Sequence, residues 1–206
     1  MNVTMSEIPK RERKSATIEG LPLLIHLFYG FAIANGLSDA LKSTIEKQSL
    51  FQWLFLVAAF LLGLGDWLAY HMHVSHVFYR SVSRLLMDLL FPALVYCLLL
   101  APTLAPTAAG VSYVAWIVFI YFAFSITYAV LLRREDPHLD QLLIYIILVS
   151  LVLSAGALLM NYLLPTSIWQ TVICHVLATG AVGLWAAYNL RLVYRIMHSD
   201  DPRNMA

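Results

Sequence analysis

Charge is scarce in this sequence. Asp, Glu, Lys and Arg make up only 12% of the 206 residues, whereas 61% are hydrophobic. Soluble domains are usually about one quarter charged, so this composition excludes an ordinary soluble protein and predicts an integral membrane protein made almost entirely of spans. The net charge is +1, which gives no reason to expect nucleic acid as a partner.

Cysteines and recognisable catalytic motifs are also few. The two cysteines, Cys97 and Cys174, both lie in apolar runs, where a cysteine usually packs as a small hydrophobic side chain, so we predict no disulfide. No G-x-S-x-G, H-E-x-x-H or phosphate-loop motif occurs. We therefore predict no catalytic residues, no metal ligands and no cofactor, and we expect that the protein is not an enzyme.

Long apolar runs dominate what is present. A spanning helix needs about 20 mostly apolar residues, and six stretches qualify. They lie near Leu21–Leu41, Leu50–Met72, Ser83–Leu100, Val111–Leu132, Leu139–Leu164 and Ile168–Tyr194. We predict an all-α bundle of six transmembrane helices over residues 21–196, with antiparallel neighbours joined by short loops. Residues 1–20 then form a basic N-terminal segment, and residues 197–206 form a short tail.

The basic residues predict the orientation of this bundle. With six spans both termini share a side, and that side receives 11 of the 13 Lys and Arg residues. These are Lys10, Arg11, Arg13, Lys14, Arg80, Arg84, Arg133, Arg134, Arg191, Arg195 and Arg203. Only Lys42 and Lys47 fall on the other side. By the positive-inside rule we predict cytoplasmic termini, in a bacterial inner membrane.

Three acidic residues, Asp39, Asp66 and Asp88, lie within predicted spans. A charge in hydrocarbon costs about 2.5–3.5 kcal/mol by insertion scales, so such residues should face protein or water. Asp66 lies in the inner half of the second span, and Arg84 can pair with Asp88 at i, i+4 or reach Asp66.

We group the residues at the inner end of the spans as a predicted inner-mouth cluster. Its members are His26, Asp66, His71, His73, Arg84 and Asp88. Two readings stay open for this cluster. One is a structural network of ion pairs and hydrogen bonds, and the other is a vestibule for ions or protons, which protonation of His71 would tune.

The first span is the most polar of the six. Ala32, Gly36 and Ala40 form a stripe of small residues on which another helix can pack closely. Beside this stripe, Asn35, Ser38 and Asp39 form a polar ridge, which is our candidate ion pathway. We expect this helix to be central in the bundle. The alternative is that the ridge is structural and that Asp39 reaches outward to the interface.

Histidines allow a redox interpretation as well. His26 and His71 both lie near the cytoplasmic side, so together they are able to clamp a haem, whereas His175 lies in the outer half. The spacing His71–His73–His76 is weak as a metal motif, because residues two apart on a helix point in different directions.

The second and third spans resemble a known family. The stretch "DWLAYHMHVSHVFYRSVSRLLMDLLFPALVYCLLLAPT" (Asp66–Thr103) is similar to the prokaryotic relatives of the endolysosomal potassium channel, with Trp67 and His71 at the Trp and His of that family. "FAIA" (Phe31–Ala34) fits its first span. The family's Arg and its Phe-Ser-Asp motif have no counterpart here, since their places hold "HLF" (residues 26–28).

The resemblance implies a homotetramer whose first spans surround a potassium pathway. Our leading hypothesis is accordingly an oligomeric ion channel or ion-conducting protein in the lipid bilayer. The first alternative is a non-conducting membrane sensor or scaffold that recruits a cytosolic protein partner, with "KRERK" (Lys10–Lys14) as its contact arm or as a segment that binds anionic lipid. A haem-containing redox subunit is the second alternative.

Overall fold

The computed structural model describes residues 20–47, 50–74, 82–104, 108–135, 141–163 and 168–197, and all of these residues are α-helical. The helices are α2 (Gly20–Lys47), α3 (Leu50–Val74), α4 (Val82–Leu104), α5 (Ala108–Glu135), α6 (Gln141–Leu163) and α7 (Ile168–Met197). Each of the six is long and apolar enough to cross a membrane. The predicted all-α bundle of six membrane-spanning helices is thereby confirmed.

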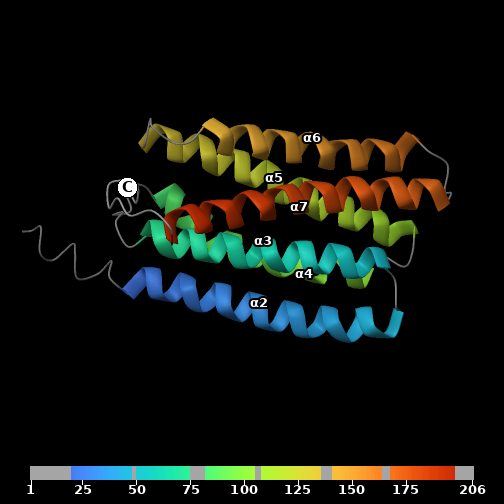
Figure 1. The fold of residues 1–206 in the computed structure, drawn as a ribbon, viewed down its shortest axis with the longest axis horizontal. Helices are drawn as coiled ribbons and strands as arrows, with labels where there is room; N and C mark the ends of the chain where they lie inside the picture. Colours follow the sequence, from blue (N-terminus) through green and yellow to red (C-terminus); the bar gives the residue numbers. More distant parts are fainter. Residues whose placement is uncertain are drawn as a thin grey trace, which may run out of the picture.

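The helices run along a common axis, and successive helices are antiparallel (Figure 1). The start of α2 and the end of α7 therefore lie at one end of the bundle, which we call the Gly20 end; the opposite end is the Lys47 end. Helices α2 and α6 lie at opposite edges: α2 packs on α4 and α3, whereas α6 packs on α7 and α5. The other four helices form the middle of the bundle.

Small residues let the helices of this bundle approach closely. On α2, Ala32 and Ala40 are buried, and a Cβ added at Gly36 would lie 2.9 Å from the Cβ of Leu99 on α4. The predicted small-residue stripe is therefore a real helix contact, formed with α4. On α3, a Cβ added at Gly65 would lie 2.7 Å from the Cβ of Asn189 on α7. The Asn189 side chain therefore packs directly against the backbone of α3.

The placement of the first span differs from the expectation. We expected this helix in the centre, but α2 lies at an edge (Figure 1) and exposes Leu23, Leu27 and Phe31. The reason is that α2 contacts the other described helices only through its small-residue side. Its opposite side is apolar in the half nearest Gly20, and an apolar side is stable in contact with lipid. A polar ridge elsewhere on α2 therefore does not force the helix into the centre of the bundle.

The third predicted span ends at Leu100, but α4 continues through Pro102 to Leu104. Two side chains satisfy carbonyls in this last turn. The Nε2 group of Gln52 on α3 donates to the carbonyl oxygen of Pro102 at 2.8 Å, and the hydroxyl of Thr103 donates to that of Leu100 at 2.7 Å. These bonds supply donors to two of the carbonyl groups that the end of a helix leaves without an intrahelical partner.

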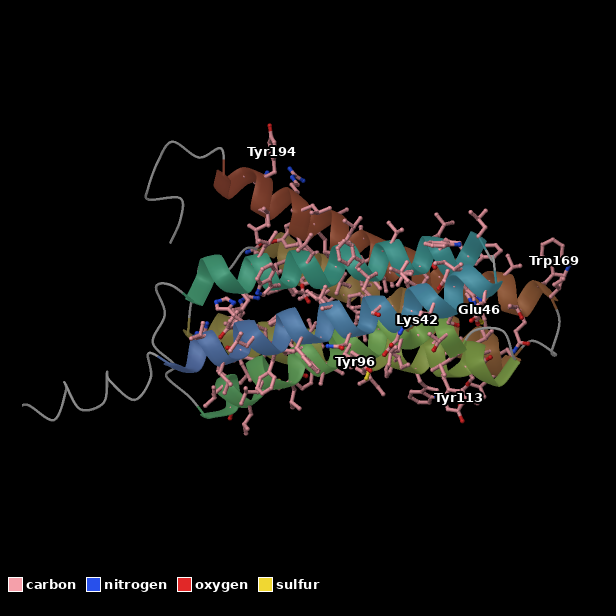
Figure 2. All side chains as sticks on the ribbon, turned by 90° about the horizontal axis from the view of Figure 1, so that it is seen from below. Lys42, Glu46, Tyr96, Tyr113, Trp169 and Tyr194 are labelled. Atoms are coloured by element: carbon pink, nitrogen blue, oxygen red, sulfur yellow. The ribbon has the colours of Figure 1, made fainter. Side chains whose placement is uncertain are left out.

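Aromatic side chains lie near the ends of the bundle. Trp116 and Trp169 are exposed at the Lys47 end, and Tyr194 is exposed towards the Gly20 end. Figure 2 shows Trp169 and Tyr194 at nearly opposite ends of α7. This is the distribution expected of side chains at the two membrane interfaces.

Candidate functional site

The polar centre of the bundle is the carboxylate of Asp66 on α3. Its Oδ1 atom accepts hydrogen bonds from the Nε1 of Trp185 at 3.0 Å and from the Nδ2 of Asn189 at 2.5 Å. Its Oδ2 atom accepts one from the hydroxyl of Tyr121. One side chain of α3 is thus bonded to both α5 and α7. We call these four residues the Asp66 network.

Local sequence places the members of this network. Trp185 and Asn189 are separated by four residues, so both lie on the same face of α7. Gly65 lets that face approach α3, since a larger side chain at position 65 would collide with Asn189. Tyr121 is fully buried, and the ring of Phe91 on α4 packs edge-on against it at 6.0 Å.

A second polar group lies on α4, where Arg84 and Asp88 are 3% and 1% exposed. The hydroxyl of Tyr128 on α5 interacts electrostatically with both side chains. Tyr29 on α2 is buried and interacts electrostatically with Asp66 and Asp88. Tyr29 therefore interacts electrostatically with both carboxylates, and residues of all four central helices and of α2 contribute to this polar region.

Members of the predicted inner-mouth cluster share tyrosine partners: Tyr128 interacts with Arg84 and Asp88, and Tyr29 interacts electrostatically with Asp66 and Asp88. The ring of His26 packs edge-on against Tyr70 at 5.2 Å. Tyr70 in turn contacts Tyr29 at 5.9 Å between ring centroids. The side chains of His71 and His73 lie outside the described residues, as does His76.

The candidate ion pathway lies on a different surface. Asn35, Ser38 and Asp39 are exposed on the side of α2 that no other described helix covers. The Nδ2 of Asn35 donates to the carbonyl oxygen of Phe31 at 2.9 Å. The Nζ of Lys42 lies 3.9 Å from the Oδ1 of Asp39, with the side chains 75% and 52% exposed. Lys42 and Glu46 lie towards the Lys47 end of this helix (Figure 2).

The two histidines whose side chains the structure describes, His26 and His175, do not form one site. His26 lies near the start of α2, while His175 lies near the start of α7 at the opposite end of the bundle (Figure 1). The Nδ1 of His175 is 2.8 Å from the carbonyl oxygen of Thr171, and its ring packs on Phe51. Among the described residues no group of three His, Cys, Asp or Glu side chains is placed to hold a metal ion.

Sequence reasoning missed most partners of Asp66. Tyr29, Tyr121, Trp185 and Asn189 were not among the candidates, although Asn189 is an amide within an apolar run. A usable signal was present: tyrosine and tryptophan favour the membrane interface, so Tyr121 in the middle of a span suggests a buried hydrogen-bond partner.

Comparison with protein-family models, curated proteins and solved structures finds no match to this chain. Its membrane-spanning helices place it in a lipid bilayer as a multi-pass membrane protein. The segment Lys10–Lys14, which the scaffold hypothesis needs, lies outside the described residues.

Proposed function

We propose that this protein is an oligomeric ion-conducting membrane protein, in which the polar ridge of α2 lines a path shared between copies. The observation that carries the proposal is the exposure of Asn35 and Asp39 on an edge helix. In a single chain surrounded by lipid, both side chains would face acyl chains, which polar groups avoid.

The depth of these residues supports the proposal. Helix α2 has 28 residues, or about 42 Å at 1.5 Å per residue, against a hydrocarbon core of about 30 Å. If the helix is centred, about 6 Å extend beyond the core at each end. Asn35, about 18 Å from Lys47, then lies near the mid-plane, and Asp39 lies about 6 Å inside the core.

A path between copies fits the packing better than a path through one chain. Large side chains that are fully buried, such as Phe55, Leu98 and Tyr121, fill the centre of the bundle. On the exposed side of α2, by contrast, a Cβ added at Gly30 would meet nothing, and Gly30, Ala34 and Ser38 recur every four residues. This spacing lets a second helix approach closely beside the polar ridge.

The resemblance to the potassium channel relatives refines the proposal. It favours a homotetramer with the α2 helices around the axis and makes K⁺ the first ion to test. The basic residues favour cytoplasmic termini, so the polar ridge would lie in the middle and outer part of the path.

The test is an ion-flux assay in liposomes with K⁺, Na⁺, H⁺ and Cl⁻. We expect flux from the wild type and a loss of about tenfold or more in Asn35→Leu and in Asp39→Leu, because each replaces a polar lining group with a branched apolar one. Glu46→Leu is the matched control, since it removes an acidic side chain from the same helix near its end. Flux that is absent from the wild type, or unchanged in Asp39→Leu, would refute the proposal.

Oligomerisation around α2 has its own test. In a Cys97→Ser, Cys174→Ser background, Ser38→Cys should form disulfide-linked dimers under mild oxidation in membranes. Ala40→Cys should not, because Ala40 is buried against the chain's own helices. Equal cross-linking at both positions would contradict the assignment of this face.

A further inference from the structure

The Asp66 network contains a feature that conduction along α2 does not use. It is a half-buried carboxylate whose three hydrogen-bond partners all donate to it. Among the described residues no Lys, Arg or His forms an ion pair with it. A carboxylate in this position is either held as an anion by neutral donors alone or takes up a proton.

The two oxygens of Asp66 have different partners, and this difference decides where a proton fits. Oδ1 accepts from the N–H groups of Trp185 and Asn189, and indole N–H is only a donor. Oδ1 therefore stays an acceptor in either protonation state, and it is the carbonyl oxygen once Oδ2 carries a proton. Oδ2 faces the Tyr121 hydroxyl, which can donate to an anion or accept from an acid.

We propose that Asp66 is a proton-binding site inside each chain, with Oδ2 as the oxygen that carries the proton. On uptake, a proton from water bonds to Oδ2, and the Tyr121 hydroxyl turns from donor to acceptor. Both N–H bonds to Oδ1 are kept. No covalent bond of the protein breaks, and the Tyr121 hydroxyl proton rotates away from Oδ2.

The ligand is a proton rather than a metal ion because of the same donors. A metal ion needs lone pairs from several oxygen or nitrogen atoms, whereas Trp185 presents a hydrogen and Asn189 turns its amide N–H₂ towards the carboxylate. A cation placed beside Oδ1 would meet these hydrogens. A proton needs only one lone pair of Oδ2.

The other titratable groups around Asp66 suggest how the proton arrives. Tyr29 on α2 interacts with Asp66 and with Asp88, and Tyr128 on α5 interacts with Asp88 and Arg84 on α4. Tyr70, one turn after Asp66 on α3, contacts Tyr29. Asp88 and Arg84 lie nearer the start of α4, at the Gly20 end. We therefore expect protons to reach Asp66 from the Gly20 end.

The experiment is infrared difference spectroscopy of the purified full-length protein in lipid nanodiscs, titrated from about pH 9 to about pH 4, a range that brackets ordinary and raised carboxyl titration. We expect a carbonyl stretching band of a buried protonated carboxyl to appear on acidification. It should be lost in Asp66→Asn and persist in Asp88→Asn. The band should also be insensitive to Na⁺ and K⁺ at constant pH.

Tyr121→Phe keeps the test decisive if Asp66→Asn does not fold. Without the phenol oxygen, the protonated Oδ2 loses its acceptor, so the band should shift in frequency. Tyr113→Phe, which changes an exposed tyrosine of the same helix, should leave it in place. The proposal is overturned by a wild type without such a band, by a band that survives Asp66→Asn, by removal of the band with Na⁺ or K⁺, or by equal effects of the two tyrosine variants.

Discussion

Two aspartates of this protein, Asp66 and Asp39, show how position decides what a membrane carboxylate can do. Asp66 lies in the middle of the bundle and accepts hydrogen bonds from Tyr121, Trp185 and Asn189. Asp39 lies on an edge helix, 52% exposed, with Lys42 3.9 Å away. The hydrogen-bond donors to Asp66 all come from its own chain. Asp39 has only an exposed lysine of its own chain beside it, so water or another copy has to supply its remaining polar contacts.

This difference separates the two proposals physically. Conduction depends on the exposed side of α2, whereas proton binding depends on α3, α5 and α7. Their failures are therefore distinguishable: Asp39→Leu tests flux without touching the Asp66 network, and the infrared experiment needs no flux.

Of the substitutions that test this comparison, Asp66→Leu should have the largest effect on the free energy of unfolding. It leaves three buried donors without an acceptor, at about 1–3 kcal/mol each, so we expect the free energy of unfolding to fall by about 3 kcal/mol or more. Unfolding by SDS titration in mixed micelles measures it. Asp39→Leu is the matched control and should change stability by no more than about 0.5 kcal/mol. Equal losses in both variants would mean that the two aspartates are not distinct in environment.

An intermediate effect is expected from Gly65→Ala, which pushes α3 away from Asn189. A new Cβ at 2.7 Å forces a shift, and overpacking of this kind costs about 1–3 kcal/mol. Gly180→Ala on α7 is the control because its Cβ would meet nothing within 4 Å. There the higher helix propensity of alanine should raise stability by up to about 1 kcal/mol. The same SDS titration should give opposite signs, and two losses of equal size would argue against the close contact of α3 and α7.

The smallest effect should come from Lys42→Met. The Lys42–Asp39 pair is exposed, and such pairs contribute little after solvent screening. We expect a change in unfolding free energy within about 0.5 kcal/mol at moderate salt. A loss well above that value would show that Asp39 is enclosed in the protein as purified, for example by another copy.

The number and approximate limits of the spans were predictable because apolar length alone determines them. The small-residue stripe of α2 was predictable too, since Ala32, Gly36 and Ala40 recur every four residues. The edge position of α2 was not, because the same pattern suits any helix that packs on one neighbour. Likewise, the sequence showed that a charged Asp66 would be unfavourable in lipid. It did not show the partners, because these lie on α5 and α7, 55 to 123 residues away in the chain.

By itself, then, the sequence determined that this is a six-span membrane protein with acidic groups that need polar surroundings. The reason is that the length of an apolar run and the cost of a charge in lipid depend only on the residues of that run. Only the tertiary structure decided which groups supply those surroundings. Hydrogen bonds between side chains depend on how helices are placed beside one another, and the close approach at Gly65 brings Asn189 and Trp185 to Asp66 while leaving Asp39 on the outside.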